Sequence, residues 1–176
     1  LKILKKKKNL RLIDASKFII KDIIKLSSLN ESLLTQSEDL KKFNIKDFKI
    51  VSKKKPSKSQ FENLIFAFNI CRYVKSNAIV LASNKSTVGI GSGQPSRLDS
   101  CQIAINKMKK FKNSNDDIVA ASDAFFPFVD GVENLVQSGV SAIIQPSGSI
   151  RDKEIIRFAN QTDTILVFSK TRHFRH

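Results

Sequence analysis

IVAASDAFFPFVDGVENLVQSGVSAIIQPSGSIRDKEIIRFANQTDTILVF, residues 118–168, alternates short apolar runs with more polar segments. The apolar runs are rich in Ile, Val and Ala, as strands that are buried on both faces are. These predicted strands span residues 118–122, 140–145 and 164–168. The segments between them suit surface helices and span residues 130–138 and 151–160. Regular strand–helix alternation predicts an α/β fold with a mostly parallel sheet and helices on both faces.

The residues before this stretch extend the same architecture. Apolar side chains recur at helical spacing from Phe61 to Val74 and predict a helix there. Pro95 opens a second predicted helix, because proline is favoured at the start of a helix. Strands are predicted over residues 78–82 and 87–90. Shorter extended segments are predicted over residues 9–15, 22–29, 32–36 and 48–52, and a surface loop over residues 111–117.

Within the opening stretch, residues 121–131 carry three phenylalanines around Pro127, with an aspartate on either side. Proline interrupts both helix and strand, so we expect a kinked loop. Such a loop could stack a planar heterocycle against its rings and accept N–H groups at Asp123 or Asp130. The alternative is a hydrophobic plug at the end of a strand, since phenylalanine is usually buried for packing alone.

Other candidates lie where ligands gather in such sheets, at strand ends and at the helix N-termini that follow. The glycine-rich run 89–93 could let backbone N–H groups approach an anion, or form a tight turn. Arg97 could pair with a phosphate or lie on the surface. Ser149, three residues before Asp152, suits a helix cap and could also contact a ligand. His173 and His176 could form a metal pair or belong to a plain tail, and we predict no metal site.

The formal net charge of +15 raises the question of nucleic acid. The excess is mostly lysine, scattered along the chain with runs at 5–8 and 53–55, and aromatics do not interleave with these runs as on a single-strand-binding surface. A solvated face is one interpretation, and attraction to small anionic ligands is the other. Cys71 and Cys101 lie in predicted helices, so we expect reduced core thiols in a cytoplasmic protein.

Five motifs occur in the order of one known family. They are Lys-Ser-Asn at 75–77, Gly-Ile-Gly-Ser-Gly-Gln-Pro-Ser-Arg at 89–97, Phe-Phe-Pro-Phe at 125–128, Pro-Ser-Gly-Ser-Ile-Arg-Asp at 146–152 and Arg-His-Phe at 172–174. Together they resemble the C-terminal part of the aminoimidazole-carboxamide ribonucleotide (AICAR) transformylase domain. That domain is one half of a bifunctional purine-biosynthesis enzyme whose other half is an IMP cyclohydrolase. The resemblance runs from the lysines near Leu4 to His176 and implies a cytidine-deaminase-like α/β subdomain.

The resemblance also implies ligands and roles. The reaction would move a formyl group from 10-formyltetrahydrofolate to AICAR, with a monovalent cation as a further cofactor left open. The family forms homodimers with sites near the subunit interface. Residues matching AICAR-binding positions are Asn77, Arg97, Phe125 and Arg172. Residues matching folate-binding positions are Leu98, Asp130, Ser149 and Ile150. Val129 departs from the family pattern, which often has arginine there, so a local ion pair with Asp130 is in doubt.

The family's catalytic Lys-His pair lies upstream of the matching region. Neither His173 nor His176 follows a lysine, so we expect no catalytic residue among residues 1–176. Because the chain begins at Leu1 rather than Met, we also expect the natural protein to be longer, with the upstream transformylase segment and the cyclohydrolase domain outside this sequence. The alternative is a non-catalytic basic module that binds nucleotides or nucleic acid. Steep salt dependence of binding would indicate that alternative.

Overall fold

The computed structural model describes residues 4–6, 8–17, 24–111 and 117–176, and these residues form two compact units. The first unit spans residues 1–40, and the second spans residues 41–176. The predicted loop 111–117, the extended segment 22–29 and the lysine run 5–8 lie partly outside the described residues. None of the helices in the described ranges is long and apolar enough to cross a membrane.

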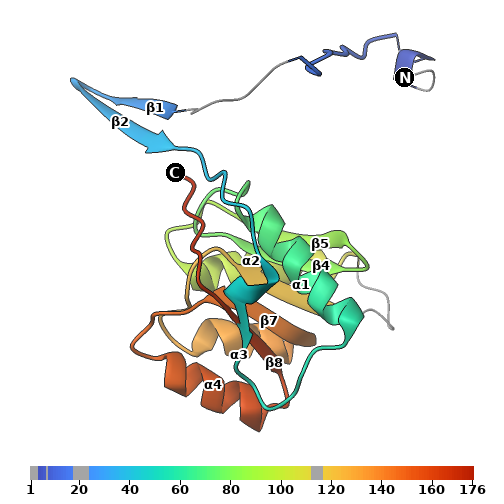
Figure 1. Ribbon diagram of the computed structural model, residues 1–176, viewed down its shortest axis with the longest axis vertical. Helices are drawn as coiled ribbons and strands as arrows, with labels where there is room; N and C mark the ends of the chain where they lie inside the picture. The colour runs from blue at the N-terminus through green and yellow to red at the C-terminus, as the bar shows by residue number, and fades with distance from the viewer. Residues whose placement is uncertain (1–3, 7, 18–23, 112–116) are drawn as a thin grey trace. The chain divides into compact units, whose positions relative to one another are not determined.

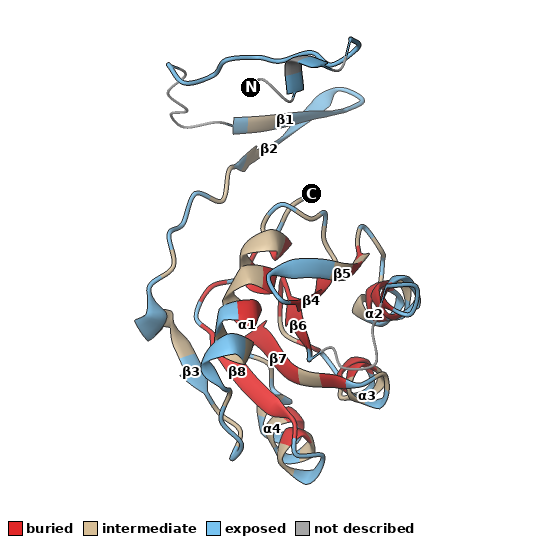
Figure 2. Cartoon of the chain, turned by 90° about the vertical axis from the view of Figure 1, so that its right-hand side faces the viewer, coloured by how far each residue is buried: buried red, intermediate tan, exposed pale blue. Residues whose placement is uncertain are grey.

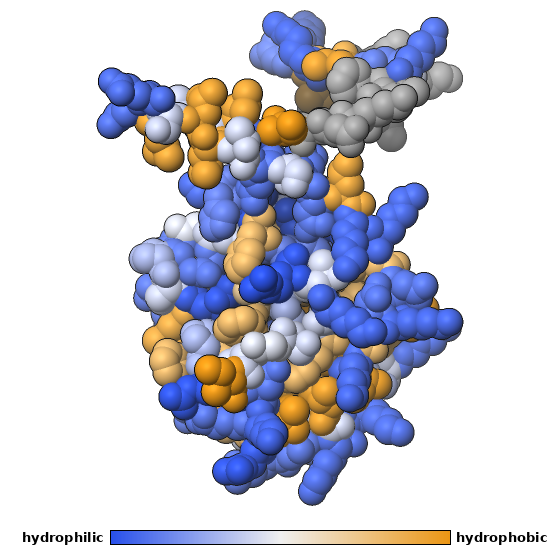
Figure 3. Space-filling model, turned by 60° about the vertical axis from the view of Figure 1, so that its left-hand side comes forward, coloured by the Kyte–Doolittle hydropathy of each residue, from blue (hydrophilic) through white to orange (hydrophobic). Residues whose placement is uncertain are grey.

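The first unit contains a short 3-10 turn, η1 (Leu4–Lys6), and an antiparallel hairpin of β1 (Ile24–Leu29) and β2 (Ser32–Ser37). The predicted extended segment over residues 9–15 forms no strand. In the hairpin, Leu26 and Leu33 are more than half exposed. On the face drawn in Figure 3, apolar side chains form separate groups among hydrophilic ones.

The second unit is a six-stranded sheet with helices on both faces (Figures 1 and 2). Its elements in chain order are η2 (Ile45–Asp47), β3 (Phe48–Ile50), α1 (Lys58–Cys71), β4 (Ile79–Ser83), β5 (Ser86–Gly91), α2 (Arg97–Met108), β6 (Ile118–Ser122), α3 (Asp130–Gln137), β7 (Val140–Pro146), α4 (Asp152–Gln161) and β8 (Ile165–Ser169). The α/β class and the covering of both sheet faces are therefore confirmed.

The sheet is mixed rather than mostly parallel. In the strand order β3-β8-β7-β6-β4-β5, only β6–β7 and β7–β8 are parallel pairs. The pairs β3–β8, β4–β6 and β4–β5 are antiparallel. The prediction of a mostly parallel sheet was wrong because it extended the βαβ pattern of residues 118–168 to the whole chain. β4 and β5 are instead joined by a tight hairpin turn, which only antiparallel neighbours allow.

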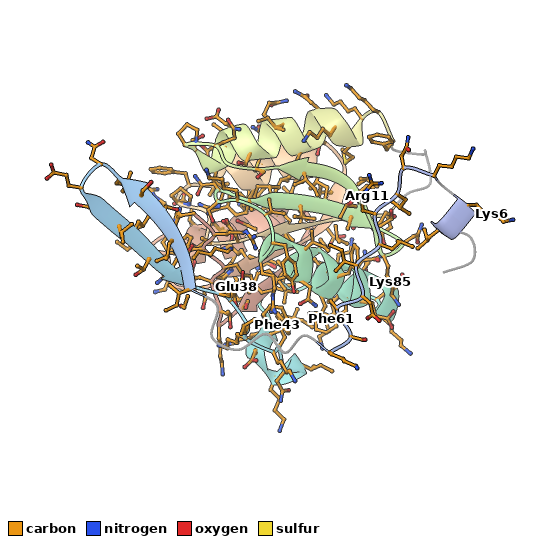
Figure 4. All side chains as sticks on the ribbon, turned by 90° about the horizontal axis from the view of Figure 1, so that it is seen from above. Lys6, Arg11, Glu38, Phe43, Phe61 and Lys85 are labelled. Carbon is orange, nitrogen blue, oxygen red and sulfur yellow. The ribbon has the colours of Figure 1, made fainter. Side chains whose placement is uncertain are left out.

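Two apolar layers hold the unit together, one on each face of the sheet (Figure 2). On one face, α1 packs Leu64, Phe68 and Cys71 against alternate residues of the central strands. Phe43 and Phe61, labelled in Figure 4, extend this layer, since the rings of both contact the Phe48 ring. On the other face, α2, α3 and α4 cover the remaining alternate strand residues. This alternation is the two-residue period of strands buried on both faces.

The two edges of the sheet differ. β3 is a three-residue edge strand that carries Lys49. β5 is the opposite edge, and the Lys107 ammonium from α2 donates a hydrogen bond to the carbonyl oxygen of Ile90 at 2.9 Å. One backbone acceptor on this edge is thus satisfied by a lysine side chain.

Candidate functional site

A pocket of about 480 Å³ opens where four segments of the second unit meet. These segments are the approach to β4, the start of α2, the phenylalanine loop after β6, and the start of α3. The lining residues are Asn77, Pro95, Ser96, Arg97, Leu98, Phe126, Pro127, Phe128, Asp130 and Gly131. The pocket brings together two residues predicted to bind AICAR, Asn77 and Arg97, and two predicted to bind folate, Leu98 and Asp130.

Arg97 is the first residue of α2, and its side chain is only 9% exposed. Its Nε donates to the Ser122 hydroxyl at 2.9 Å, and its Nη2 donates to Asp123 Oδ1 at 2.7 Å. Arg97 is therefore neither a surface residue nor a freely available cation. These two bonds use two of the five guanidinium N–H groups, so up to three can donate to a ligand in the pocket.

Asn77 lies just before β4, and its side chain is held in one orientation. The amide nitrogen donates to the carbonyl oxygens of Gln94 at 3.0 Å and Pro95 at 3.2 Å. Its own backbone carbonyl accepts from the Ser100 hydroxyl at 2.8 Å. Because both amide hydrogens are engaged, the side chain can interact with a ligand only through Oδ1, as a hydrogen-bond acceptor.

The phenylalanine loop combines packing and exposure. Phe126 is 1% exposed and belongs to the core layer, yet it also lines the pocket. Phe128 is 53% exposed, and the guanidinium of Arg151 lies 4.8 Å from its ring centre. The two interpretations of this loop therefore apply to different rings: Phe126 is a plug, whereas Phe128 presents a ring to the pocket.

Gly131 fixes how close the loop can lie to α3. A Cβ added to Gly131 would lie 2.8 Å from two ring carbons of Phe126. Only a residue without a side chain leaves room for this ring. Asp130, immediately before it, accepts a hydrogen bond from the Gly131 N–H at 2.7 Å and is itself exposed at the pocket.

The remaining predicted site residues do not line this pocket. Phe125 is partly buried beside Phe126, and Arg172 is exposed with its guanidinium 5.4 Å from the Phe174 ring centre. Ile150 is fully exposed. The Ser149 hydroxyl accepts from the Arg151 N–H at 3.1 Å, and the Asp152 carboxylate accepts from the Ser149 N–H at 3.3 Å. The prediction that Ser149 caps the helix was wrong, because the N-cap of α4 is Arg151, which makes no side-chain capping bond. The turn containing Ser149 adjoins the pocket through the contact of Arg151 with Phe128.

Two glycines of the run 89–93 allow close packing of a helix against the sheet. A Cβ on Gly91 would lie 2.6 Å from the carbonyl carbon of Ser100 in α2, and one on Gly89 would meet the Ala104 carbonyl in the same way. β5 and α2 are therefore in direct backbone contact at these two positions. Gly93 alone has the left-handed backbone conformation, with φ of 67°, that a turn requires.

The sequence prediction missed Ser76 and gave Asp123 a different role, as an acceptor for the N–H groups of a ligand, whereas its two carboxylate oxygens accept from Arg97 and Ser76. The Asp123 carboxylate is completely buried and joins Arg97, Ser76 and the end of β6. One signal was available: an aspartate directly after an apolar strand must find a cation or several donors if it is buried. The spacing between Asp123 and Arg97 gives no such signal, because the two are 26 residues apart and meet only where the end of β6 lies beside the start of α2.

The two cysteines are buried and free, as predicted. Burial raises the pKa of Cys101 to about 12, and burial together with the Asp123 charge raises the pKa of Cys71 as well.

We expect both thiols to resist a thiol reagent at pH 8 in the folded chain and to react on unfolding. Because the unfolded thiols ionise near pH 9, stability should fall as the pH rises from about 9 towards 12. Labelling rates with and without denaturant check the first point, and a rapid reaction of native Cys101 would contradict it.

Known proteins match the chain over its whole length. The model of the family described as the AICARFT/IMPCHase bienzyme matches residues 1–107. The bifunctional purine biosynthesis protein PurH of Buchnera aphidicola subsp. Schizaphis graminum is 44% identical over 99% of this chain. PurH of Leptospira biflexa serovar Patoc is 46% identical over the full chain. In both cases the chain spans 34% of the relative's length.

Among solved structures, a dCMP deaminase from the cyanophage S-TIM5 matches 64% of this chain and 98% of its own, with 17% identity and a TM-score of 0.43. The family match over residues 1–107 includes two of the four segments that form the pocket, the approach to β4 with Asn77 and the start of α2 with Arg97. The chain belongs to the AICARFT/IMPCHase bienzyme family.

Proposed function

We propose that this chain forms part of the folate-dependent formyltransferase of its family, which would move a formyl group from 10-formyltetrahydrofolate to the amine of AICAR in the cytoplasm. One observation carries the proposal. Residues matched to the nucleotide, Asn77 and Arg97, and residues matched to the folate, Leu98 and Asp130, line the same pocket. A group transfer needs its two substrates side by side, and holding them so is a large part of catalysis.

The pocket supplies complementary chemistry for both ligands. Asn77 Oδ1 can accept an N–H group, and the remaining Arg97 N–H groups can donate to a carboxamide or phosphate oxygen. The exposed Phe128 ring can stack on a flat heterocycle. The exposed Asp130 carboxylate can accept the N–H groups of the folate ring. In the transfer, the bond between the formyl carbon and the folate N10 breaks while the carbon bonds to the AICAR amine; the amine loses one proton and N10 gains one.

No residue of this pocket is proposed to take that proton. His173 packs its ring against Phe68 and Phe43, with ring centres 4.6 and 5.2 Å apart. We therefore expect the 176-residue chain to bind both substrates without turnover and to need further residues, from a longer chain or from a second subunit of a homodimer, for catalysis. The role of these residues in the proposal is positioning.

Calorimetric titration of the chain with AICAR tests the proposal, with Arg157→Ala as the matched control. Arg157 is an exposed arginine on α4 that does not line the pocket, so its loss removes the same charge elsewhere. We expect Arg97→Ala to weaken AICAR binding about tenfold to a hundredfold and Arg157→Ala to leave it within about twofold. Equal losses in both variants, falling steeply with salt, would instead indicate a general basic surface.

The family name covers two activities, and a second assay separates them. The chain is incubated with formylated AICAR, and IMP formation is followed without folate. We expect no IMP above the uncatalysed rate. Sustained IMP formation by the repurified chain would assign it to the cyclohydrolase part of the family and overturn the proposal.

Asp130→Asn is expected to weaken folate binding while leaving AICAR binding nearly unchanged. The substitution keeps the side-chain size and removes the charge, and a charge-assisted hydrogen bond contributes about 1.5–3 kcal/mol. The matched control is Glu133→Gln, one turn further along α3 and also exposed. Titrating 5-formyltetrahydrofolate and AICAR separately checks the split. Loss of AICAR binding alone would place Asp130 on the nucleotide side of the pocket.

A further inference from the structure

The Asp123 carboxylate is buried beside the pocket. It does not line the pocket itself, but it is bonded to Arg97, which does. Asp123 follows the last residue of β6, and its side chain is 0% exposed. Oδ1 accepts from Arg97 Nη2 at 2.7 Å, and Oδ2 accepts from the Ser76 hydroxyl at 2.6 Å. Each carboxylate oxygen is thus assigned to a different donor.

This carboxylate is held on its backbone side as well. The Asp123 N–H donates to the Ala78 carbonyl at 3.2 Å, and its carbonyl accepts from the His173 N–H at 2.9 Å. Ser76 is held in turn, since its hydroxyl accepts from the Arg175 N–H at 3.2 Å. Hydrogen bonds from three parts of the chain therefore hold Asp123 in place: the end of β6, the residues just before β4, and the C-terminal segment.

The orientation of the Arg97 side chain depends on its bonds to Asp123 and the residue before it. Its bonds through Nε and Nη2 run to Ser122 and Asp123, consecutive residues at the end of β6. Two bonds to neighbouring residues fix both the position and the plane of a guanidinium group. An uncharged neighbour in place of Asp123 would hold that plane with a weaker bond and leave the buried arginine charge without its counter-ion.

We propose that Asp123 is a positioning residue for the nucleotide subsite: it acts through Arg97, whose remaining N–H groups it aims at the ligand. The proposal rests on the proposed function and adds to it a residue that does not touch the substrate. A buried ion pair adds little to stability compared with an apolar pair of the same size, so a role in orientation accounts for its place beside the pocket.

Asp123→Asn, combined with Arg97→Ala, tests the proposal. The dissociation constants of AICAR and 5-formyltetrahydrofolate are measured by calorimetry for the chain, both single variants and the double variant. We expect Asp123→Asn to weaken AICAR binding about tenfold to a hundredfold and folate binding less than about twofold. In the Arg97→Ala background, Asp123→Asn should cause no further loss of AICAR binding, because a residue that acts through Arg97 has nothing left to orient.

Ser76→Ala provides a second variant that keeps both charges of the pair. It removes one of the two donors that hold the Asp123 carboxylate, and we expect AICAR binding to weaken about two- to tenfold. This variant decides the matter if Asp123→Asn does not fold, which circular dichroism reports. The matched control is Ser141→Ala, since Ser141 is a partly buried hydroxyl at the start of β7 that does not line the pocket.

The outcomes separate this proposal from the proposed function. If the unaltered chain binds no AICAR, both are overturned. If Arg97→Ala weakens AICAR binding while folded Asp123→Asn and Ser76→Ala do not, only the positioning role is overturned. Equal weakening of AICAR and folate binding by Asp123→Asn, or additive losses in the double variant, would also overturn it, because a merely structural residue affects both ligands independently of Arg97.

Discussion

Gly91→Ala is expected to destabilise the second unit by about 3 kcal/mol or more. Overpacking usually costs roughly 1–3 kcal/mol because side chains can move aside. Here the added Cβ meets backbone atoms of Ser100, which no change of rotamer relieves. α2 must move away from β5, and the contacts of both Gly89 and Gly91 with the helix are lost together. A fall in Tm of about 6–12 °C follows for a chain of this size.

Thermal unfolding of Gly91→Ala and Gly148→Ala measures the effect against a matched change. Gly148 has a φ of 114° and nothing within 4 Å of an added Cβ, so its substitution costs backbone strain without a clash. Because α2 begins with Arg97, Gly91→Ala should also weaken AICAR binding. A Tm for Gly91→Ala equal to that of the unaltered chain would show that the strand and the helix are not in backbone contact.

Phe126→Ala is expected to cost about 3–5 kcal/mol, the usual range for deleting a buried ring. The ring is 1% exposed and lies against Gly131 in the layer under α2 and α3. Phe128→Ala is the matched control: its ring is half exposed, so we expect a loss of stability below about 1 kcal/mol. For ligand binding we expect the opposite order. Relative to the stability that each variant loses, Phe128→Ala should weaken ligand binding more than Phe126→Ala does, because Phe128 presents its ring to the pocket.

Denaturant unfolding gives the stabilities, and AICAR titration of the folded variants gives the affinities. If Phe126→Ala costs no more stability than Phe128→Ala, the loop does not act as a plug. If Phe128→Ala binds both ligands as well as the unaltered chain does, the exposed ring is not part of the substrate site. The two variants thus test the two interpretations of the same Phe-Phe-Pro-Phe sequence.

The sequence predicted most elements of the second unit because its strands and helices carry distinct periods. The apolar run 140–145 and the helical repeat from Phe61 to Val74 both formed the elements expected of them, with ends shifted by a few residues. Pairing directions were not predictable in the same way. Whether β4 pairs parallel or antiparallel with β6 depends on the connection through β5, and no residue of β4 predicts the direction of that pairing.

The site was predictable only in part. Arg97, at a helix start, could be found because the fold class brings strand ends and helix starts together. Asn77 was found only through the family resemblance. The partner of Arg97 could not be predicted, since Asp123 follows β6 and lies 26 residues further along the chain, and the two meet only in the folded unit. The packing role of Gly89 and Gly91 could not be predicted for a related reason: a missing side chain leaves room for an approaching helix as well as for an anion or a turn.

Lys107, which donates a hydrogen bond to the edge strand β5, shows that part of the chain's positive charge can protect the fold rather than bind a ligand. An edge strand exposes unpaired carbonyl and N–H groups, and a strand of another molecule can pair with them. Lys107 occupies the Ile90 carbonyl at this edge, and a strand arriving there would have to displace a charged group and bury it. The opposite edge, β3, offers only three residues. At high concentration, replacing Lys107 with an apolar residue of similar length should therefore favour fibrillar assembly, a hazard that ligand binding would never reveal.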